Sequence, residues 1–195
     1  MAGVVLTVLS ALWLMLPAYL SNMLPVFVGG GRPIDNGRVW RDGRRMLGDG
    51  KTLRGLLLAP LCAAAITGGL QLIATRTDWG AWGFPDWGGG AWWFALAYAL
   101  ALGALVGDAV ESFFKRRLGK ERGDRWIPFD QLDFVVGALV FGLVTGLVAQ
   151  LAIGENIFLT RFTWERVVAI VLLTPALHLL VNFIGYKIGT KDVPW

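Results

Sequence analysis

Five long apolar stretches constrain this chain of 195 residues more than any other feature of its sequence. They run roughly from Val4 to Leu24, Leu53 to Ala74, Ala91 to Gly107, Phe134 to Ile153 and Val167 to Ile188. A helix rises about 1.5 Å per residue, so about 20 residues cross a hydrocarbon core of about 30 Å. Charged residues make up 16% of the chain, well below the roughly one quarter that is usual in soluble domains. We therefore expect an all-α integral membrane protein with about five transmembrane helices, which form a single transmembrane domain over residues 1–195.

The basic residues lie mainly in two of the connections between these stretches, at about 25–53 and about 111–133. The first holds Arg32, Arg38, Arg41, Arg44, Arg45 and Lys51, and the other holds Lys115, Arg116, Arg117, Lys120, Arg122 and Arg125. Because Lys and Arg accumulate in cytoplasmic loops, we expect both connections to be cytoplasmic. The N-terminus should then lie outside and the C-terminus in the cytoplasm, in a multi-pass protein of the cell membrane.

Small residues recur within the apolar stretches at the spacing that lets membrane helices approach closely. Gly103 with Gly107, and Gly142 with Gly146, each have this small-xxx-small pattern. We expect both pairs to lie at helix contacts.

The third apolar stretch runs directly into a charged segment that could carry chemistry. If the helix continues, then Asp108, Glu111, Ser112 and Lys115 lie at positions i, i+3, i+4 and i+7 and share one face. Carboxylates suit Mg²⁺, and cations neutralise phosphoryl oxygens, so this face fits a site for a metal and a phosphate. The alternative is a solvated helix end whose cations reach out to water.

A second acidic segment, Pro128-Phe129-Asp130-Gln131-Leu132-Asp133, leads into the fourth stretch. The ordinary structural reading is that Asp130 is a natural N-cap residue, and acids in a first helical turn are favoured by the helix dipole. In antiparallel neighbours joined by a short loop, Asp108 would meet Asp130 and Asp133 at the same membrane depth. Three converging carboxylates require cations, which favours one or two Mg²⁺ ions held by Asp108, Asp130 and Asp133.

The first basic loop contains Gly48-Asp49-Gly50-Lys51-Thr52, which superficially resembles a phosphate-binding P-loop. A Walker motif requires glycine at position 45, where this chain has Arg45, and no strand is predicted before it. The segment remains a glycine-flanked turn that could bring Asp49, Lys51 and Thr52 close to a phosphate or a nucleotide.

The only histidine, His178, lies one helical turn before Asn182 in the fifth stretch. A single intramembrane histidine cannot supply a Ser/His or Cys/His catalytic pair. Two roles stay open for these side chains: a hydrogen bond between helices, or contact with the polar headgroup of a substrate.

These motifs together resemble those of the CTP-dependent cytidylyltransferases of phospholipid synthesis. The resemblance rests on G-D-A-V-E-S-F-F-K-R-R-L-G-K from Gly107 to Lys120, on the paired Asp130 and Asp133, and on the Lys-Thr-x-x-Gly element at Lys51 to Gly55. The chain lacks the Pro-Gly-His-Gly-Gly run of the bacterial and eukaryotic phosphatidate enzymes and has fewer helices. In these departures it resembles the archaeal branch, the CDP-archaeol synthases, over essentially its whole length.

The resemblance implies transfer of CMP from CTP to the phosphate of 2,3-bis-O-geranylgeranylglycerol 1-phosphate, with release of pyrophosphate. It implies that Asp108, Asp130, Asp133 and Lys115 are catalytic, with Mg²⁺ held by the three aspartates. The implied residues for binding CTP and phosphate are Asp49, Gly50, Lys51, Thr52, Glu111, Ser112 and Arg116. The expected partners are CTP, a prenylated glycerol phosphate lipid and the membrane, and no nucleic acid.

The main alternative is a small cation transporter or channel with an acidic cytoplasmic site. Such a protein should carry ionisable residues deep in several helices, whereas this sequence places nearly all of them at the cytoplasmic boundary. A CDP-alcohol phosphotransferase is disfavoured because its Asp-Gly-x-x-Ala-Arg signature is missing.

Overall fold

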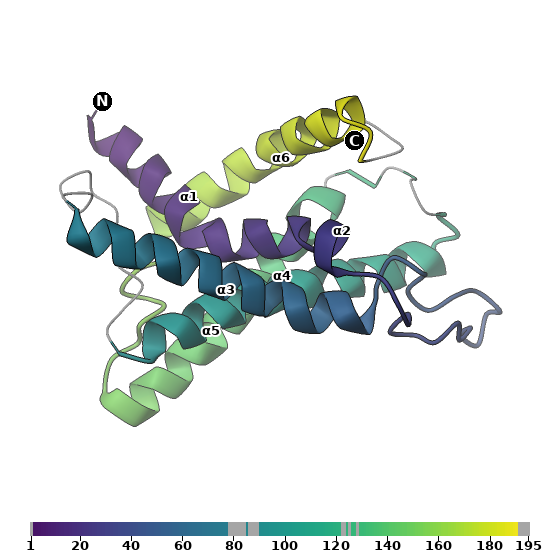
Figure 1. Cartoon of the computed structure of the whole chain (residues 1–195), viewed down its shortest axis with the longest axis horizontal. Helices are drawn as coiled ribbons and strands as arrows, with labels where there is room; N and C mark the ends of the chain where they lie inside the picture. The colour runs from purple at the N-terminus through teal and green to yellow at the C-terminus, as the bar shows by residue number, and fades with distance from the viewer. Residues whose placement is uncertain are drawn as a thin grey trace.

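The computed structural model is a bundle of helices (Figure 1) and describes residues 2–77, 85, 90–121, 124, 126–127 and 129–190. Its helices are α1 (Ala2–Met23), α2 (Pro25–Val28), α3 (Leu53–Arg76), α4 (Trp92–Arg117), α5 (Phe129–Ile153) and α6 (Trp164–Lys187). Among these residues the only β pairings are two isolated bridges, Pro33 with Thr52 and Val39 with Arg45. Five segments are long and apolar enough to cross a membrane: α1 continued through α2, and α3 to α6. The all-α membrane fold predicted from the sequence is therefore confirmed.

The helix boundaries show how the two acidic segments enter the structure. α4 continues without a break from Gly107 to Arg117, so the predicted acidic stripe is helical throughout. α5 begins at Phe129, so Asp130 lies in the first turn of the helix, where its charge is favoured by the helix dipole, and not at the N-cap. The side chain of Asp130 instead reaches back and accepts a hydrogen bond from the Trp126 amide at 2.7 Å. Arg122, Arg125 and Pro128 lie outside the described residues.

α4 and α5 pack as antiparallel neighbours through glycines whose backbones nearly touch. A Cβ placed on Gly137 would lie 2.1 Å from the carbonyl oxygen of Gly103 and 2.8 Å from the Cα of Gly107. A Cβ on Gly107 would lie 2.3 Å from the carbonyl oxygen of Asp133. Only glycine fits at these positions, and the contact fixes the end of α4 against the beginning of α5.

The second predicted glycine pair has a different partner. Gly142 and Gly146 both accommodate Phe158, which lies on the connection between α5 and α6, and Gly142 also contacts Leu100 of α4. Phe158 stacks on Phe162, with 4.5 Å between the ring centroids. This glycine pair thus makes room for Phe158 of the connecting loop as well as for Leu100 of α4.

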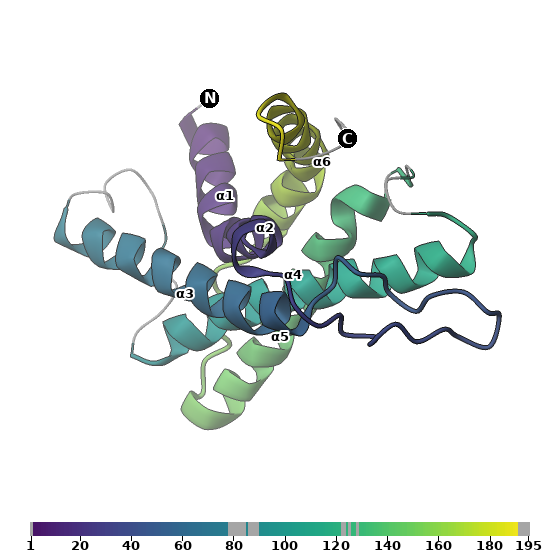
Figure 2. The same ribbon diagram turned by 45° about the vertical axis from the view of Figure 1, so that its right-hand side comes forward.

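The remaining helices cover the α4 and α5 pair. α1 contacts α3, α4, α5 and α6, and the Tyr19 hydroxyl of α1 lies 2.8 Å from the Thr174 hydroxyl of α6. In Figures 1 and 2 the first turns of α5 lie between the end of α4 and the end of α6. The segment 29–52, called loop one below, runs alongside the end of α4 on the side away from α6. The largest fully buried apolar side chains belong to Leu14, Met15, Leu96, Leu100, Val135 and Ile170.

We predict that Gly137→Ala lowers the thermal stability of the purified protein by several degrees and reduces activity, because the added methyl group forces α4 and α5 apart. Overpacking of this kind costs about 1–3 kcal/mol. Gly69→Ala in α3 is the matched control, since a Cβ there meets nothing within 4 Å and alanine favours the helix. Thermal unfolding in detergent measures both, and an unchanged melting temperature for Gly137→Ala would contradict the proposed importance of this contact.

Candidate active site

A polar cavity of about 750 Å³ lies where loop one, the end of α4, the beginning of α5 and α6 meet. Its size falls within the range of about 300–1,000 Å³ that is usual for small-molecule sites. Every site residue predicted from the sequence lines it except Thr52: Asp49, Gly50, Lys51, Asp108, Glu111, Ser112, Lys115, Arg116, Asp130 and Asp133. Thr52 instead accepts a hydrogen bond from the Gly55 amide at 3.1 Å and caps the start of α3.

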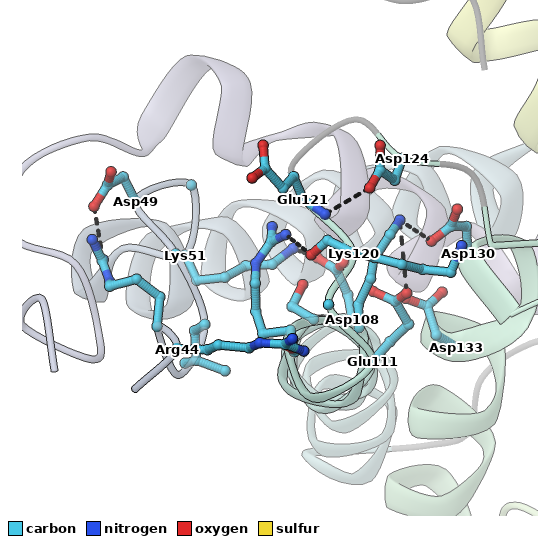
Figure 3. Close-up of a pocket in the computed structure, with 18 of the residues that line it drawn as sticks. Arg44, Asp49, Lys51, Asp108, Glu111, Lys120, Glu121, Asp124, Asp130 and Asp133 are labelled. Atoms are coloured by element: carbon cyan, nitrogen blue, oxygen red, sulfur yellow. Dashed lines mark hydrogen bonds and ion pairs between the residues drawn. The ribbon is translucent and has the colours of Figure 1, made fainter. Parts of the chain in front are cut away.

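Three carboxylates converge in this cavity (Figure 3), with oxygen atoms that all lie within 4.8 Å of one another. Asp108 and Glu111 come from one face of α4, and Asp133 comes from α5. The Glu111 side chain is only 8% exposed, and its Oε1 atom has no hydrogen-bond partner among the described residues. Hard oxygen ligands at this spacing, one of them buried without a hydrogen bond, fit a divalent cation such as Mg²⁺.

Asp130 lies beside this group and is paired with a cation. Lys115 Nζ is 2.6 Å from Asp130 Oδ1 and 3.9 Å from Glu111 Oε1. The group of converging carboxylates therefore contains Glu111 where the sequence prediction had Asp130. Asp130 lies in the first turn of α5, within reach of Lys115 at the end of α4.

Loop one brings cations to the opposite wall of the cavity. Lys51 forms an ion pair with Asp108, as Figure 3 shows. Gly48 has a φ of +110°, and a Cβ there would lie 3.9 Å from the Arg116 guanidinium. Glycine is favoured at position 48 by this positive φ, whereas a Cβ there would meet Arg116 only at ordinary contact distance. Asp49 is 74% exposed at its side chain and accepts a hydrogen bond from Arg45 at 2.8 Å.

A buried aspartate, Asp35, holds loop one in shape. Its carboxylate accepts hydrogen bonds from Arg45 at 3.0 and 3.2 Å, from the Leu47 amide at 3.0 Å, and from the Gly48 and Gly37 amides at 3.1 Å. Burial alone would raise the pKa of Asp35, but the bonds from Arg45 and these amides lower it well below its usual range. The charged form of Asp35 therefore stabilises the folded loop.

Loop one is also fastened to the end of α4. That helix ends with Gly119 at a φ of +77°, where the Gly119 amide bonds to the Arg116 carbonyl and the Lys120 amide to the Lys115 carbonyl. This is the Schellman pattern, which satisfies part of the free carbonyls at a helix end. The Arg44 side chain donates to the carbonyls of Arg116 and Arg117, at 3.3 and 3.0 Å.

Arg117 completes this attachment from the helix side. Its guanidinium pairs with Asp42, donates to the carbonyls of Arg44 and Arg45, and lies 5.0 Å from the Phe113 ring centroid. The Phe113 ring in turn packs edge-on against Trp40, with 5.4 Å between centroids. Loop one and the end of α4 therefore form one structural unit around the cavity.

Sequence reasoning missed several residues of this site. Arg44, Arg45, Gly48, Gly119, Lys120, Glu121 and Asp124 also line the cavity. Of these, Gly48, Gly119 and Lys120 lie within the motifs quoted above, and Gly119 also follows a helix with basic residues in its last turn. His178 and Asn182, whose role was left open, line it as well.

The fold and the cavity define a class of protein. A multi-pass bundle with a nucleotide-sized cavity at one end of its helices, lined by carboxylates and by Lys and Arg, is suited to an intramembrane enzyme that handles charged phosphate groups.

Comparisons with known proteins give the family. The model of the CarS-like CDP-archaeol synthases matches residues 4–195. The CDP-archaeol synthase of Methanospirillum hungatei JF-1 is 45% identical over 93% of this chain and 100% of its own length, and that of Thermococcus onnurineus NA1 is 43% identical over 97% and 98%. A solved intramembrane enzyme for archaeal membrane lipid biosynthesis is 39% identical, with a TM-score of 0.66 over 90% of this chain and 94% of that one. This chain belongs to the CDP-archaeol synthase family and is a CTP-using nucleotidyltransferase.

We predict that Asp35→Asn loosens loop one and speeds its cleavage by trypsin about tenfold, because charge-assisted hydrogen bonds of about 1.5–3 kcal/mol each are weakened. A depressed pKa means that Asp35 contributes stability above its unfolded value of about 3.9, and loses it only as the pH falls through the lower folded value. The difference between wild type and variant should therefore be the same at about pH 8 and about pH 6. Glu165→Gln, at the start of α6, is the control, and equal cleavage of all three proteins would refute the role of Asp35.

Proposed function

We propose that this enzyme transfers CMP from CTP to the phosphate of a prenylated glycerol phosphate, 2,3-bis-O-geranylgeranylglycerol 1-phosphate. An oxygen of the lipid phosphate attacks the α-phosphorus of CTP, and the bond from that phosphorus to the bridging oxygen of the β-phosphate breaks. Pyrophosphate leaves and CDP-archaeol forms. The observation that carries the proposal is the trio of carboxylates facing Lys and Arg side chains within one cavity at the end of membrane helices.

The reaction needs cations more than it needs a base. A phosphate monoester has its second pKa near 6, so the nucleophile is largely ionised at neutral pH. Two anionic reactants must nevertheless approach each other in line, which requires neutralisation of their charge. Lys51, Lys115 and Arg116 line the cavity and are suited to bind the triphosphate.

Mg²⁺ is the cofactor that the donor set fits best. Asp108, Glu111 and Asp133 would hold it, with Asp130 beside them through Lys115. A bound Mg²⁺ supplies charge neutralisation at the phosphoryl oxygens. Asp49, Gly50, Thr52 and Ser112 complete the proposed nucleotide side, Thr52 by fixing the turn at which α3 begins.

The proposed orientation places the cavity on the cytoplasmic side of the cell membrane. The two basic connections, about 25–53 and about 111–133, form the same end of the bundle, and Lys and Arg accumulate in cytoplasmic loops. The N-terminus then lies outside and the C-terminus inside. CTP reaches the cavity from the cytoplasm, the lipid reaches it from the membrane, and no nucleic acid takes part.

The transport alternative is not favoured. A permeation pathway requires ionisable side chains along several helices. In the described spans the acidic residues of α4 and α5 instead meet at one end of the bundle.

The proposal predicts a specific distribution of label from CTP. Purified protein with Mg²⁺ and the geranylgeranyl lipid should move label from the α-phosphate into an organic-soluble product, and label from the γ-phosphate into pyrophosphate. Asp108→Asn and Asp133→Asn should each lower the rate at least about 100-fold, because they remove charge that stabilises the transition state.

Glu155→Gln, on the connection between α5 and α6, should keep the wild-type rate. Chelation of divalent cations should abolish turnover, and added Mg²⁺ should restore it. If wild-type protein labelled none of several phosphatidate-like lipids, or both aspartate variants kept full rate, the proposed reaction would have to be abandoned.

A further inference from the structure

α6 contributes two polar side chains to the cavity although it is otherwise an apolar membrane helix. His178 and Asn182 both line the cavity together with Asp133. They lie one turn apart, with the Asn182 amide nitrogen 3.4 Å from His178 Nε2. Asn182 is only 3% exposed. Polar groups within a membrane span are costly and often functional, so a polar pair that lines a cavity is suited to bind a polar ligand.

α6, which carries this pair, lies away from loop one. The first turns of α5 lie between the end of α4 and the end of α6, and loop one lies on the other side of α4 (Figures 1 and 2). The His178 ring packs on α5, with 6.2 Å between its centroid and that of Phe134, the neighbour of Asp133. The pair therefore reaches the cavity from α6, beside the start of α5, whereas Lys51 reaches it from loop one.

The lipid-facing surface of α6 surrounds this polar pair. Leu179, Leu180, Phe183 and Ile184 are all exposed on the outside of the bundle, where they can contact acyl or prenyl chains. α6 packs on α1 and α5 and leaves much of its length uncovered by the bundle. A lipid lying against α6 would have its chains beside these apolar residues and its headgroup at His178 and Asn182.

The chemistry of the pair suits a phosphate held at membrane depth. An imidazole N–H and a carboxamide NH₂ both donate hydrogen bonds to phosphate oxygens. Neither side chain carries the permanent charge of Lys or Arg, which is costly within the apolar region of the membrane. His178 and Asn182 can thus bind two oxygens of the lipid phosphate and leave another oxygen free to attack the α-phosphorus of CTP.

We infer that His178 and Asn182 bind the phosphate of the acceptor lipid, which enters along α6 while CTP occupies the loop-one side of the cavity. The inference rests on the proposed function for the identity of the acceptor. It assigns the two walls of one cavity to two different substrates.

The test measures the KM for the lipid and the KM for CTP separately. His178→Phe keeps the ring that packs on Phe134 but removes the donors, and Asn182→Leu removes the amide. Each should raise the KM for the lipid at least tenfold and leave the KM for CTP within twofold. His178→Gln, which retains a donor, should recover part of the lipid affinity. Val168→Leu, at an exposed position near the other end of the same helix and outside the cavity lining, is the matched control and should behave as wild type.

A second measurement does not depend on turnover. Native mass spectrometry without CTP should show geranylgeranylglycerol phosphate bound to wild type and Val168→Leu, and lost from the two cavity variants. If the variants bind the lipid as wild type does, or lose CTP affinity equally, the inference is wrong. A wild type that binds the lipid through His178 but forms no labelled product would instead overturn the proposed reaction and leave this phosphate site standing.

Discussion

The site depends on how closely two helices approach. Gly103 and Gly107 of α4 face Gly137 of α5 with no room for a methyl group between them. This contact sets the register in which Asp108 and Glu111 meet Asp133. If larger residues stood at these glycines the helices would separate, and three carboxylates would no longer share one point. Packing in the membrane-spanning part therefore determines the chemistry at its end.

The converging negative charge is balanced from outside the helix pair. Lys51 from loop one pairs with Asp108, and Lys115 pairs with Asp130. Loop one can do this because Asp35 fixes its internal shape and Arg117 fastens it to α4. Under the proposed function, a divalent ion beside the carboxylates would take the place of these cations and leave Lys51 and Lys115 available to a triphosphate.

The sequence predicted much of this arrangement for physical reasons. Apolar length defined the five spans, and the 3.6-residue period correctly placed Asp108, Glu111 and Lys115 on one face of a continuous helix. What could not be predicted was non-local. Asp130 accepts a hydrogen bond from the Trp126 amide of the preceding segment and pairs with Lys115 of α4, and its position in the sequence reveals neither contact. The contributions of loop one arise from contacts between residues more than 50 positions apart, as for Lys51 with Asp108 and Arg117 with Asp42, and no local pattern encodes them.

The most direct test of the account is to locate the divalent ion. Crystals of the protein grown with CTP and Mn²⁺ in place of Mg²⁺ would reveal the metal by its anomalous scattering. We predict a peak within bonding distance of Asp108, Glu111 and Asp133, between those side chains and the nucleotide phosphates. A structure with CTP bound in the cavity and the metal elsewhere, or with the three carboxylates turned away from one another, would contradict the central claim that the contact between α4 and α5 builds a metal site.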